Sequence, residues 1–319
     1  MGGTRPTPSV ACVDADHPYV HLGGDQVRQP AGEDGRVGCD RTFRSDRKVK
    51  ELSQIAAPPG GKLLHLAKLA AEQVLWARVA TQRLMDQRRG RKRPLPEPTP
   101  ATDVLRTTAE YESSVRECRE LGLPLHRDKS KNWDALGAVS TVLTALGTDI
   151  RVLDAGAARY SSVLPWLRLY DVRELVGNNL EFTRVIRHGG VQFEYGDVTA
   201  THYRDGWFDA VTCMSVIEHG VPLDAFLAES ARILRPGGLL VVSTDYDQEP
   251  PDTVGKYAYG VQVKIFGPDD IKALVESAKM VGLELEGDLA LEHSERPVHW
   301  PRTGLDYTFI RLTFTRVAR

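Results

Sequence analysis

The stretch Ile150-Arg-Val-Leu-Asp-Ala-Gly-Ala-Ala-Arg-Tyr160 decides the fold of this chain of 319 residues. An apolar run of strand length, Ile150–Leu153, ends in the acid Asp154, and Gly156 follows two residues later. A helix-like segment over 160–169 comes next. A glycine in a tight turn lets a ligand approach backbone N–H groups and the positive end of a helix. The stretch therefore predicts a strand, a ligand-binding turn and a helix.

Beyond residue 149, apolar runs alternate with helix-like segments. The runs are Ile150–Leu153, Glu174–Val176, Val191–Tyr195, Phe208–Cys213 and Leu239–Ser243, and helices are expected over 160–169, 179–188 and 223–234. Such alternation predicts a parallel sheet with helices on both faces. A helix over 268–281 precedes two late runs, Leu283–Leu289 and Tyr307–Arg316, which predict an antiparallel pair at the end of the sheet.

Ligands of a parallel α/β sheet bind beyond the carboxyl ends of the strands. We therefore expect the polar and small residues that follow the apolar runs to converge on one cleft. Taken singly, an acid at such a position can simply cap a helix or a turn. The residues that follow the runs are Asp154, Ala155, Gly156, Asn178, Asn179, Gly196, Asp197, Met214, Ser215, Glu218, His219, Thr244, Asp245 and Tyr246.

Five motifs in this order carry a family resemblance: VLDAGAA, ELVGNNL, FEYGDVT, WFDAVTCMSVIEH and ARILRPGGLLVVST. The chain resembles the class I S-adenosylmethionine-dependent methyltransferases. The resemblance implies a doubly wound, mostly parallel, seven-stranded α/β sheet of the Rossmann-like methyltransferase type, with an antiparallel C-terminal strand, over residues 149–319. It also implies S-adenosyl-L-methionine as cofactor and S-adenosyl-L-homocysteine as product.

The resemblance assigns cofactor-binding roles along the strand ends. The methionine part of the cofactor would lie by Asp154, Ala155 and Gly156, with Met214 and Ser215 across the cleft. The ribose would lie by Asn179 and Leu180, and the adenine by Asp197 and Val198. The chain departs from the family pattern Asp-x-Gly-x-Gly-x-Gly, because Ala158 and Tyr160 replace glycines and Asn179 replaces the ribose acid.

Methyl transfer is mostly a matter of positioning, and a hydroxyl acceptor must also lose its proton. Histidine suits that task near neutral pH. We expect His219 to be the base, Glu218 to orient it or to contact the acceptor, and Asp245 to be the second candidate base. The alternative for His219 is a histidine that orders its loop through a hydrogen bond.

Acceptor recognition is assigned to polar and aromatic residues near the expected cleft. The long segment 245–266 is typical of a lid, and the polar run 126–134 suggests a wall of the cofactor or acceptor site. No metal site is expected, because the spacing of the aspartates in the lid is not diagnostic. An ordinary surface loop is the alternative for each segment. The candidate acceptor contacts are Trp133, Tyr246, Lys256, Tyr257, Lys264 and His299.

The chain before residue 149 is expected to fall into two parts. Residues 1–60, rich in Gly, Pro, Asp and Arg, predict a loosely structured segment. Their Cys12, His17, His21 and Cys39 do not have the spacing of a zinc site. Residues 61–148 predict a helical extension with a proline-rich linker near 94–100. Its helices are expected over 62–89, 101–121 and 133–146, the first of them packed on the main domain or forming a homodimer contact.

Composition excludes several classes of protein. A formal net charge of −2 argues against nucleic acid as a partner. The few, irregularly spaced cysteines argue against a disulfide framework. No apolar run is long enough to span a bilayer, and the N-terminus lacks the apolar core of a signal peptide. These observations favour a cytoplasmic setting.

Taken together, the sequence predicts a methyltransferase that acts on oxygen of a small polar, saccharide-like or natural-product acceptor, of the kind found in bacteria. Two alternatives stay open. One is a non-catalytic binding or assembly module that keeps the fold. The other is a nucleic-acid methyltransferase that uses the basic run 88–94.

Overall fold

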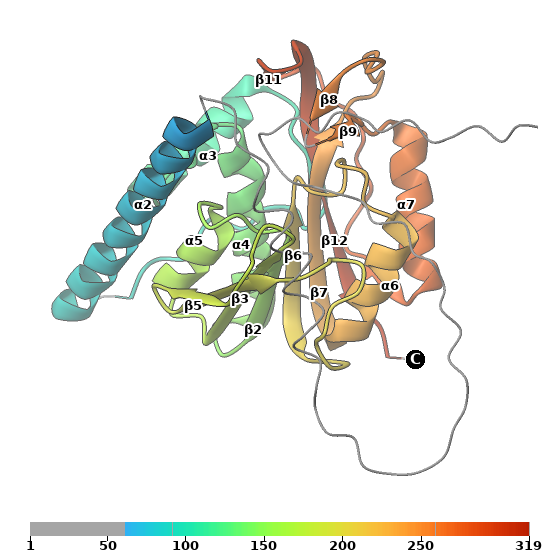
Figure 1. Ribbon diagram of the computed structural model, residues 1–319. Helices are drawn as coiled ribbons and strands as arrows, with labels where there is room; N and C mark the ends of the chain where they lie inside the picture. The colour runs from blue at the N-terminus through green and yellow to red at the C-terminus, as the bar shows by residue number, and fades with distance from the viewer. Residues whose placement is uncertain (1–60, 91, 259, 319) are drawn as a thin grey trace, which may run out of the picture.

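The computed structural model describes residues 61–90, 92–258 and 260–318 (Figure 1). The expectations for residues 1–60, including the zinc ligands that were considered, lie outside the described residues. Within the described ranges, no helix is long and apolar enough to cross a membrane.

One twisted sheet forms the centre of the molecule, in the order β1-β12-β7-β6-β2-β3-β5-β4 (Figure 1). Its middle five strands are parallel, whereas β12 is antiparallel to β7 and β10 is antiparallel to β12. Together these are the seven strands that the family resemblance implies. Their bounds are β2 Arg151–Ala155, β3 Glu174–Asn179, β5 Val191–Tyr195, β6 Phe208–Met214, β7 Leu234–Tyr246, β10 Leu283–Leu285 and β12 Leu305–Arg316.

Short strands extend this sheet at its edges. Strands β1 (Asp103–Val104) and β11 (Val298–Trp300) pair with β12, and β4 (Ile186–His188) pairs with β5. A separate hairpin of β8 (Tyr257–Ala258) and β9 (Val261–Gln262) lies within the segment expected to be a lid.

Helices cover both faces of the sheet, as expected for a doubly wound fold (Figure 1). Apolar side chains pack between the helices and the sheet on both faces. One apolar core lies between the sheet and helices α4 and α5, and the other lies between the sheet and helices α6 and α7. Helix α2 flanks α5 at the outer side of the first layer. The helices are α2 Gly61–Arg89, α3 Thr108–Glu120, α4 Lys131–Leu146, α5 Val163–Leu169, α6 Leu223–Ile233 and α7 Pro268–Met280.

The prediction of a helix over 179–188 is wrong. Strand β3 continues to Asn179, and the chain then forms turns and strand β4, antiparallel to β5. Gly189 and Gly190 join β4 to β5 with φ of 60° and 86°. A two-residue hairpin turn of type I′ needs positive φ at both positions, so the Gly-Gly pair directly before the apolar run at Val191 was the signal for this hairpin.

The expected helix over 101–121 begins later than predicted. Residues Asp103–Val104 form β1, and α3 starts only after Thr107, whose hydroxyl accepts from the Glu110 N–H at 3.3 Å. Thr107 and Glu110 have the spacing of a capping box, which is a stronger start signal than a threonine before a proline.

Helix α4 is fixed against the sheet by a buried arginine of β12. Arg311 is 1% exposed, donates to the Pro100 carbonyl at 2.7 Å, and lies over the Trp133 ring at 4.9 Å. A Cβ added to Gly137 on α4 would come within 1.8 Å of the guanidinium. Glycine at this position therefore lets α4 approach β12 closely.

We expect Gly137→Ala to lower the free energy of unfolding by about 1–3 kcal/mol, because one methyl overpacks a filled site. Urea unfolding measures the change. Ala145→Ser adds one atom to the exposed side of the same helix and serves as the matched control. Equal stability of the two variants would contradict the close approach of α4 and β12.

Candidate active site

The turn at Gly156 shapes the end of β2. Its φ is 79°, and a Cβ at this position would lie 2.6 Å from the Val216 side chain. The Gly156 N–H donates to the Asn178 side-chain oxygen at 3.3 Å, and the Asn179 amide donates to the Gly156 carbonyl at 3.0 Å. Two neighbouring side chains of β3 therefore hold both sides of a turn that only glycine fits.

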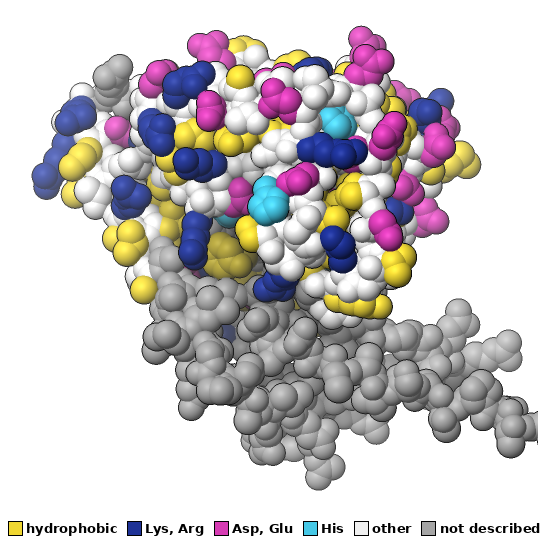
Figure 2. Space-filling model, turned by 90° about the horizontal axis from the view of Figure 1, so that it is seen from above, with side chains coloured by type: hydrophobic (Ala, Val, Ile, Leu, Met, Phe, Trp, Pro, Cys, Tyr) yellow, Lys and Arg dark blue, Asp and Glu magenta, His cyan; other side chains and the backbone are white. Residues whose placement is uncertain are grey.

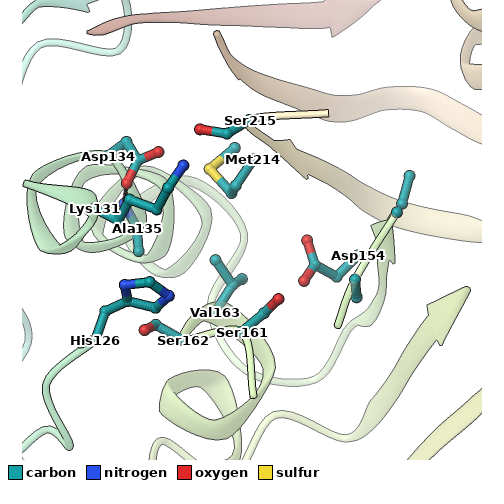
Figure 3. A pocket seen from close by; sticks show the side chains of 13 residues that line it. His126, Lys131, Asp134, Ala135, Asp154, Ser161, Ser162, Val163, Met214 and Ser215 are labelled. Carbon is teal, nitrogen blue, oxygen red and sulfur yellow. Dashed lines mark hydrogen bonds between the residues drawn. The ribbon is translucent and has the colours of Figure 1, made fainter. Parts of the chain in front are cut away.

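A cavity of about 60 Å³ opens beside this turn (Figure 3). Three parts of the chain supply its walls: the first turn of α4 with the loop before it, the loop from β2 to α5, and the end of β6. Figure 3 shows Asp154 and Ser161 on one side of the cavity and Lys131 on the other, with its ammonium directed toward Asp134 and Ser215. The lining residues are His126, Lys131, Asp134, Ala135, Asp154, Ala155, Gly156, Ala157, Ser161, Ser162, Val163, Met214 and Ser215.

Asp154 is the buried acid of this cavity. It is 1% exposed and accepts a hydrogen bond from the Thr212 hydroxyl at 2.7 Å. Burial raises the pKa of Asp154 to about 7, against the opposing effect of that hydrogen bond. The carboxyl is therefore poised to ionise when a cation enters the cavity, because a positive neighbour favours the charged form.

A second charged group of the cavity lining is Lys131 of α4, whose ammonium lies 5.0 Å from the centre of the Phe309 ring. Burial opposes the charge of Lys131, but the carboxylates of Asp134, Asp245 and Glu218 raise its pKa above the ordinary value. Burial, helped by the Lys131 charge, lowers the pKa of His126, so this histidine is neutral near pH 7. The cavity thus combines an acid and an ammonium, a donor set that suits a zwitterion.

Asp134 ties α4 to the ends of β6 and β7. Its carboxylate accepts from the Ser243 hydroxyl at 2.7 Å, and the Ser243 oxygen accepts from the Ser215 N–H at 3.2 Å. Ser215 itself has a φ of 52°, which turns the chain sharply at the end of β6. These contacts fix the far wall of the cavity.

The three predicted catalytic residues lie together at the ends of β6 and β7. Glu218 accepts from the Thr244 hydroxyl at 3.2 Å, and burial followed by the charge of Asp245 raises its pKa well above the ordinary value. Burial raises the pKa of Asp245 to about 7, although Lys131 and a hydrogen bond from Tyr307 oppose this. His219 Nε2 lies 4.0 Å from Glu218 Oε1. The imidazole is 6.5 Å from the Trp300 ring, between centroids.

The residues predicted for the ribose and adenine lie outside the cavity lining. Asn179 is 4% exposed, and its amide is engaged by the Gly156 turn. Asp197 accepts from the N–H and the hydroxyl of Thr199, at 2.9 and 2.7 Å, and so caps its own turn. Leu180 and Val198 are partly exposed beside them. Their roles toward a cofactor stay predictions.

The predicted acceptor contacts are scattered. Tyr246 is fully buried, and its hydroxyl donates to the Leu291 carbonyl at 2.8 Å, which places it in the core. Lys264 forms an ion pair with Asp270 at 2.9 Å on the surface. Trp133 packs into a small apolar cluster with Tyr307 and Phe309.

The other three lie near the turn between β11 and β12. Lys256 donates to the Thr303 carbonyl at 2.8 Å, His299 pairs with Asp306 at 2.7 Å, and Tyr257 is 61% exposed. The segment 245–266, which was expected to be a lid, is held near its start, where Arg296 binds the Asp247 carboxylate at 2.6 and 2.9 Å.

Sequence reasoning missed several lining residues. His126, Lys131 and Asp134 belong to the run 126–134, which was expected to form a wall, but none was singled out. Ser161 and Ser162 lie in a loop longer than expected, since α5 begins only at Val163. The charged run before α4 could have indicated His126, Lys131 and Asp134. The Ser-Ser pair at the start of α5 could have indicated Ser161 and Ser162.

The residues that replace family glycines leave the cavity open. Tyr160 is 40% exposed and does not line the cavity. The Ala158 N–H donates to the Ser161 hydroxyl at 3.0 Å, which closes the loop on itself. The bulk of the tyrosine is therefore directed away from the site.

Comparison with known proteins places this geometry in a family context. Residues 153–242 match the family model described as a methyltransferase domain. The chain is 35% identical over 115 residues to the demethylmenaquinone methyltransferase of Beutenbergia cavernae, a match of 36% of this chain and 43% of that protein. It is 32% identical over 103 residues to the ubiquinone biosynthesis O-methyltransferase of Mesorhizobium japonicum, covering 30% of this chain and 41% of that protein.

A third relative is the sterol 24-C-methyltransferase of Yarrowia lipolytica, 28% identical over 123 residues, which are 36% of this chain and 32% of that protein. The chain therefore spans less than half the length of each of these curated relatives. Among solved structures, it is similar to the geranyl diphosphate C-methyltransferase of Streptomyces coelicolor A3(2). The TM-score is 0.44 at 16% identity, over 61% of this chain and 85% of that one.

The buried acid makes stability depend on pH. The folded chain keeps a proton on Asp154 up to about pH 7, whereas an unfolded chain releases it near pH 4. The Asp154 contribution to the free energy of unfolding therefore falls as the pH rises through that window. Asp154→Asn keeps an oxygen for the Thr212 hydroxyl and removes this loss.

We expect the stability of Asp154→Asn relative to the natural chain to rise between about pH 4 and about pH 8, by at most ~4 kcal/mol. Urea unfolding at several pH values measures this difference. Parallel pH profiles for the two proteins would show that Asp154 does not hold its proton in the folded state.

Proposed function

We propose, from the premise that this chain carries a class I S-adenosylmethionine-dependent methyltransferase domain, that it transfers a methyl group from that cofactor to a small-molecule acceptor. The observation that carries the proposal is the cavity at the carboxyl ends of β2 and β6, whose lining includes Asp154, Lys131 and Gly156. Ligand sites of open α/β sheets lie at this edge.

The lining fits the methionine end of the cofactor. Asp154 would hold its ammonium group, and Lys131 with His126 would hold its carboxylate. The bare backbone of Gly156 gives close access to the chain. We assign the ribose to the region of Asn179 and Leu180 and the adenine to Asp197 and Val198, at the ends of the next two strands. When bound, the cofactor supplies an electrophilic methyl group on a sulfonium.

His219 is the base that we propose for an oxygen acceptor. It follows β6, and its side chain is 12% exposed, so its ring is largely shielded from water. A hydroxyl proton would pass to His219 as the acceptor oxygen bonds to the methyl carbon. Glu218 Oε1 lies 4.0 Å from His219 Nε2, and the imidazolium that forms would favour the ionised form of this carboxyl, which would in turn stabilise the imidazolium. The chain's own contribution is therefore alignment and removal of one proton.

The acceptor class rests on the rim of the site. Polar and aromatic residues of the lid and of the β11–β12 turn, among them Lys256, Tyr257 and His299, support a small polar, saccharide-like or natural-product acceptor. The names of the relatives include both carbon and oxygen methylation. A histidine beside a buried acidic pair favours oxygen, since a hydroxyl needs its proton removed.

The basic run at the end of α2 does not favour a nucleic-acid substrate. Arg93 forms an ion pair with Asp86 at 2.6 Å and also donates to the Leu121 carbonyl. Figure 2 shows basic and acidic side chains intermixed over the face seen from above. A nucleic-acid site usually gathers basic groups on one face.

Binding of S-adenosylhomocysteine, measured by titration calorimetry, tests the cofactor assignment. We expect the natural chain to bind it, and Gly156→Ala to lose at least about tenfold in affinity through backbone strain and the clash with Val216. Gly206→Ala is the matched control, because Gly206 also has a positive φ, of 62°, but does not line the cavity, and a Cβ there would meet Arg235 only at an ordinary contact distance of 3.7 Å.

The absence of binding by the natural chain at millimolar ligand would refute the cofactor site and favour the non-catalytic module. Equal affinity of the two alanine variants would refute the role of the Gly156 turn.

Turnover tests the base. With S-adenosylmethionine and a panel of phenols, quinols and sugars, release of S-adenosylhomocysteine identifies an acceptor. We expect His219→Ala to lower kcat by roughly 10²–10⁴-fold and to keep the affinity for S-adenosylhomocysteine. Undiminished kcat in this variant would remove His219 as the base.

A further inference from the structure

Helix α2 carries a buried acid that the fold alone does not require. Glu72 is 2% exposed although α2 flanks the outside of the molecule (Figure 1). Carboxylates are rarely buried without a cationic or hydrogen-bonding partner. The partners of Glu72 therefore identify the part of the protein that this face of α2 contacts.

Those partners lie in the loop of the cofactor site and in the neighbouring hairpin. Arg159 Nη1 is 3.3 Å from Glu72 Oε1, and His188 Nδ1 is also 3.3 Å from that oxygen. One turn further along α2, the Trp76 indole N–H donates to the Arg159 carbonyl at 3.1 Å. Helix α2 thus holds Arg159 by its backbone and by its side chain.

Trp76 is closely seated. It is 2% exposed, stacks on the His188 ring at 5.2 Å between centroids, and meets Phe193 edge-on at 6.1 Å. A Cβ added to Gly189 would come within 2.3 Å of its ring. The indole therefore has one position between the β4–β5 hairpin and the loop from β2 to α5.

Arg159 is two residues from the cavity wall. The Ala158 N–H donates to the Ser161 hydroxyl, and Ser161 lines the cavity. Arg159 lies in the chain between the donor and the acceptor of this hydrogen bond, so its position affects both. The contacts from α2 consequently bear on the shape of the cavity itself.

We propose that Glu72 and Trp76 are positioning residues for the cofactor, and that they hold the 156–162 loop in the conformation that receives its methionine end. The inference deepens the proposed function and rests on it. In this chain the loop has one glycine where the resembled family has three. In this chain, contacts from α2 fix the conformation of the loop, a task that a compact glycine-rich turn would perform in the resembled family.

A second tether of α2 provides the matched control. Arg83 binds Asp171 at the end of α5, with Nε 3.1 Å from the carboxylate. This pair joins α2 to the body of the protein and does not touch the loop. Arg83→Gln therefore reports the effect of loosening the helix without releasing Arg159.

The test combines hydrogen exchange of the loop with ligand affinity, in the full chain. We expect Trp76→Phe and Glu72→Gln to speed amide exchange in peptides covering 156–162 before any ligand is added. Each variant should also weaken S-adenosylhomocysteine binding by about fivefold, as expected for loss of one hydrogen bond or ion pair. Once an acceptor has been identified, the KM for the cofactor should also rise by about fivefold, while kcat should change by less than about twofold.

Arg159→Met tests the contact from the loop side. If Glu72 acts through Arg159, the double variant Glu72→Gln/Arg159→Met should bind no more weakly than the weaker single variant. Additive losses would overturn the assignment. So would effects of Glu72→Gln and Trp76→Phe that do not exceed those of Arg83→Gln.

The exchange measurement separates the two proposals. Absence of ligand binding by the natural chain would refute the cofactor site, and the exchange rates of the loop would still show whether α2 orders it. Binding by the natural chain, with unchanged exchange and affinity in both α2 variants, would refute the positioning role alone.

Discussion

The turn at Gly156 determines where each charged group of the site can lie. The chain must leave β2 with a positive φ and without a side chain, because Val216 occupies the space that a Cβ would need. Asn178 and Asn179 hold the two sides of this peptide from the adjacent strand. This turn keeps Asp154 buried at the strand end and directs the following loop toward α2. The cavity is the space left between that loop and α4.

Burial and charge then act together. Asp154, Glu218 and Asp245 all have raised pKa values because water is excluded from them, and Lys131 is the cation held among the acids of this region. Such a cluster is costly for stability unless it serves binding or proton transfer. An acid and a lysine in the lining of one cavity fit the methionine end of the cofactor, and the acidic pair near His219 fits the neighbouring proton transfer. The apolar cores on either side of the sheet hold this arrangement in place.

Much of the fold could be predicted from the sequence, because parallel strands and the helices between them leave regular patterns. The hairpin at 186–193 was missed because residues 179–188 were interpreted by helical spacing, whereas Gly189 and Gly190 govern the local chain. Among the residues of the site, Asp154, Gly156, Met214 and Ser215 could be predicted from the sequence, since they lie at or just after strand ends. Tyr246 also follows a strand end, but it faces the core, and side-chain direction depends on register. The contribution of Lys131, Asp134, Glu72 and Trp76 depends on how distant helices pack, which local pattern does not encode.

The central claim is that Asp154 keeps a proton in the free protein and gives it up to receive a cation. Titration calorimetry with S-adenosylhomocysteine at about pH 7, in two buffers of different ionisation enthalpy, measures the protons exchanged on binding. With a pKa of about 7, half of the Asp154 carboxyls carry a proton before binding. The natural chain should therefore release about half a proton more than Asp154→Asn. Equal proton release by the two proteins would contradict the account.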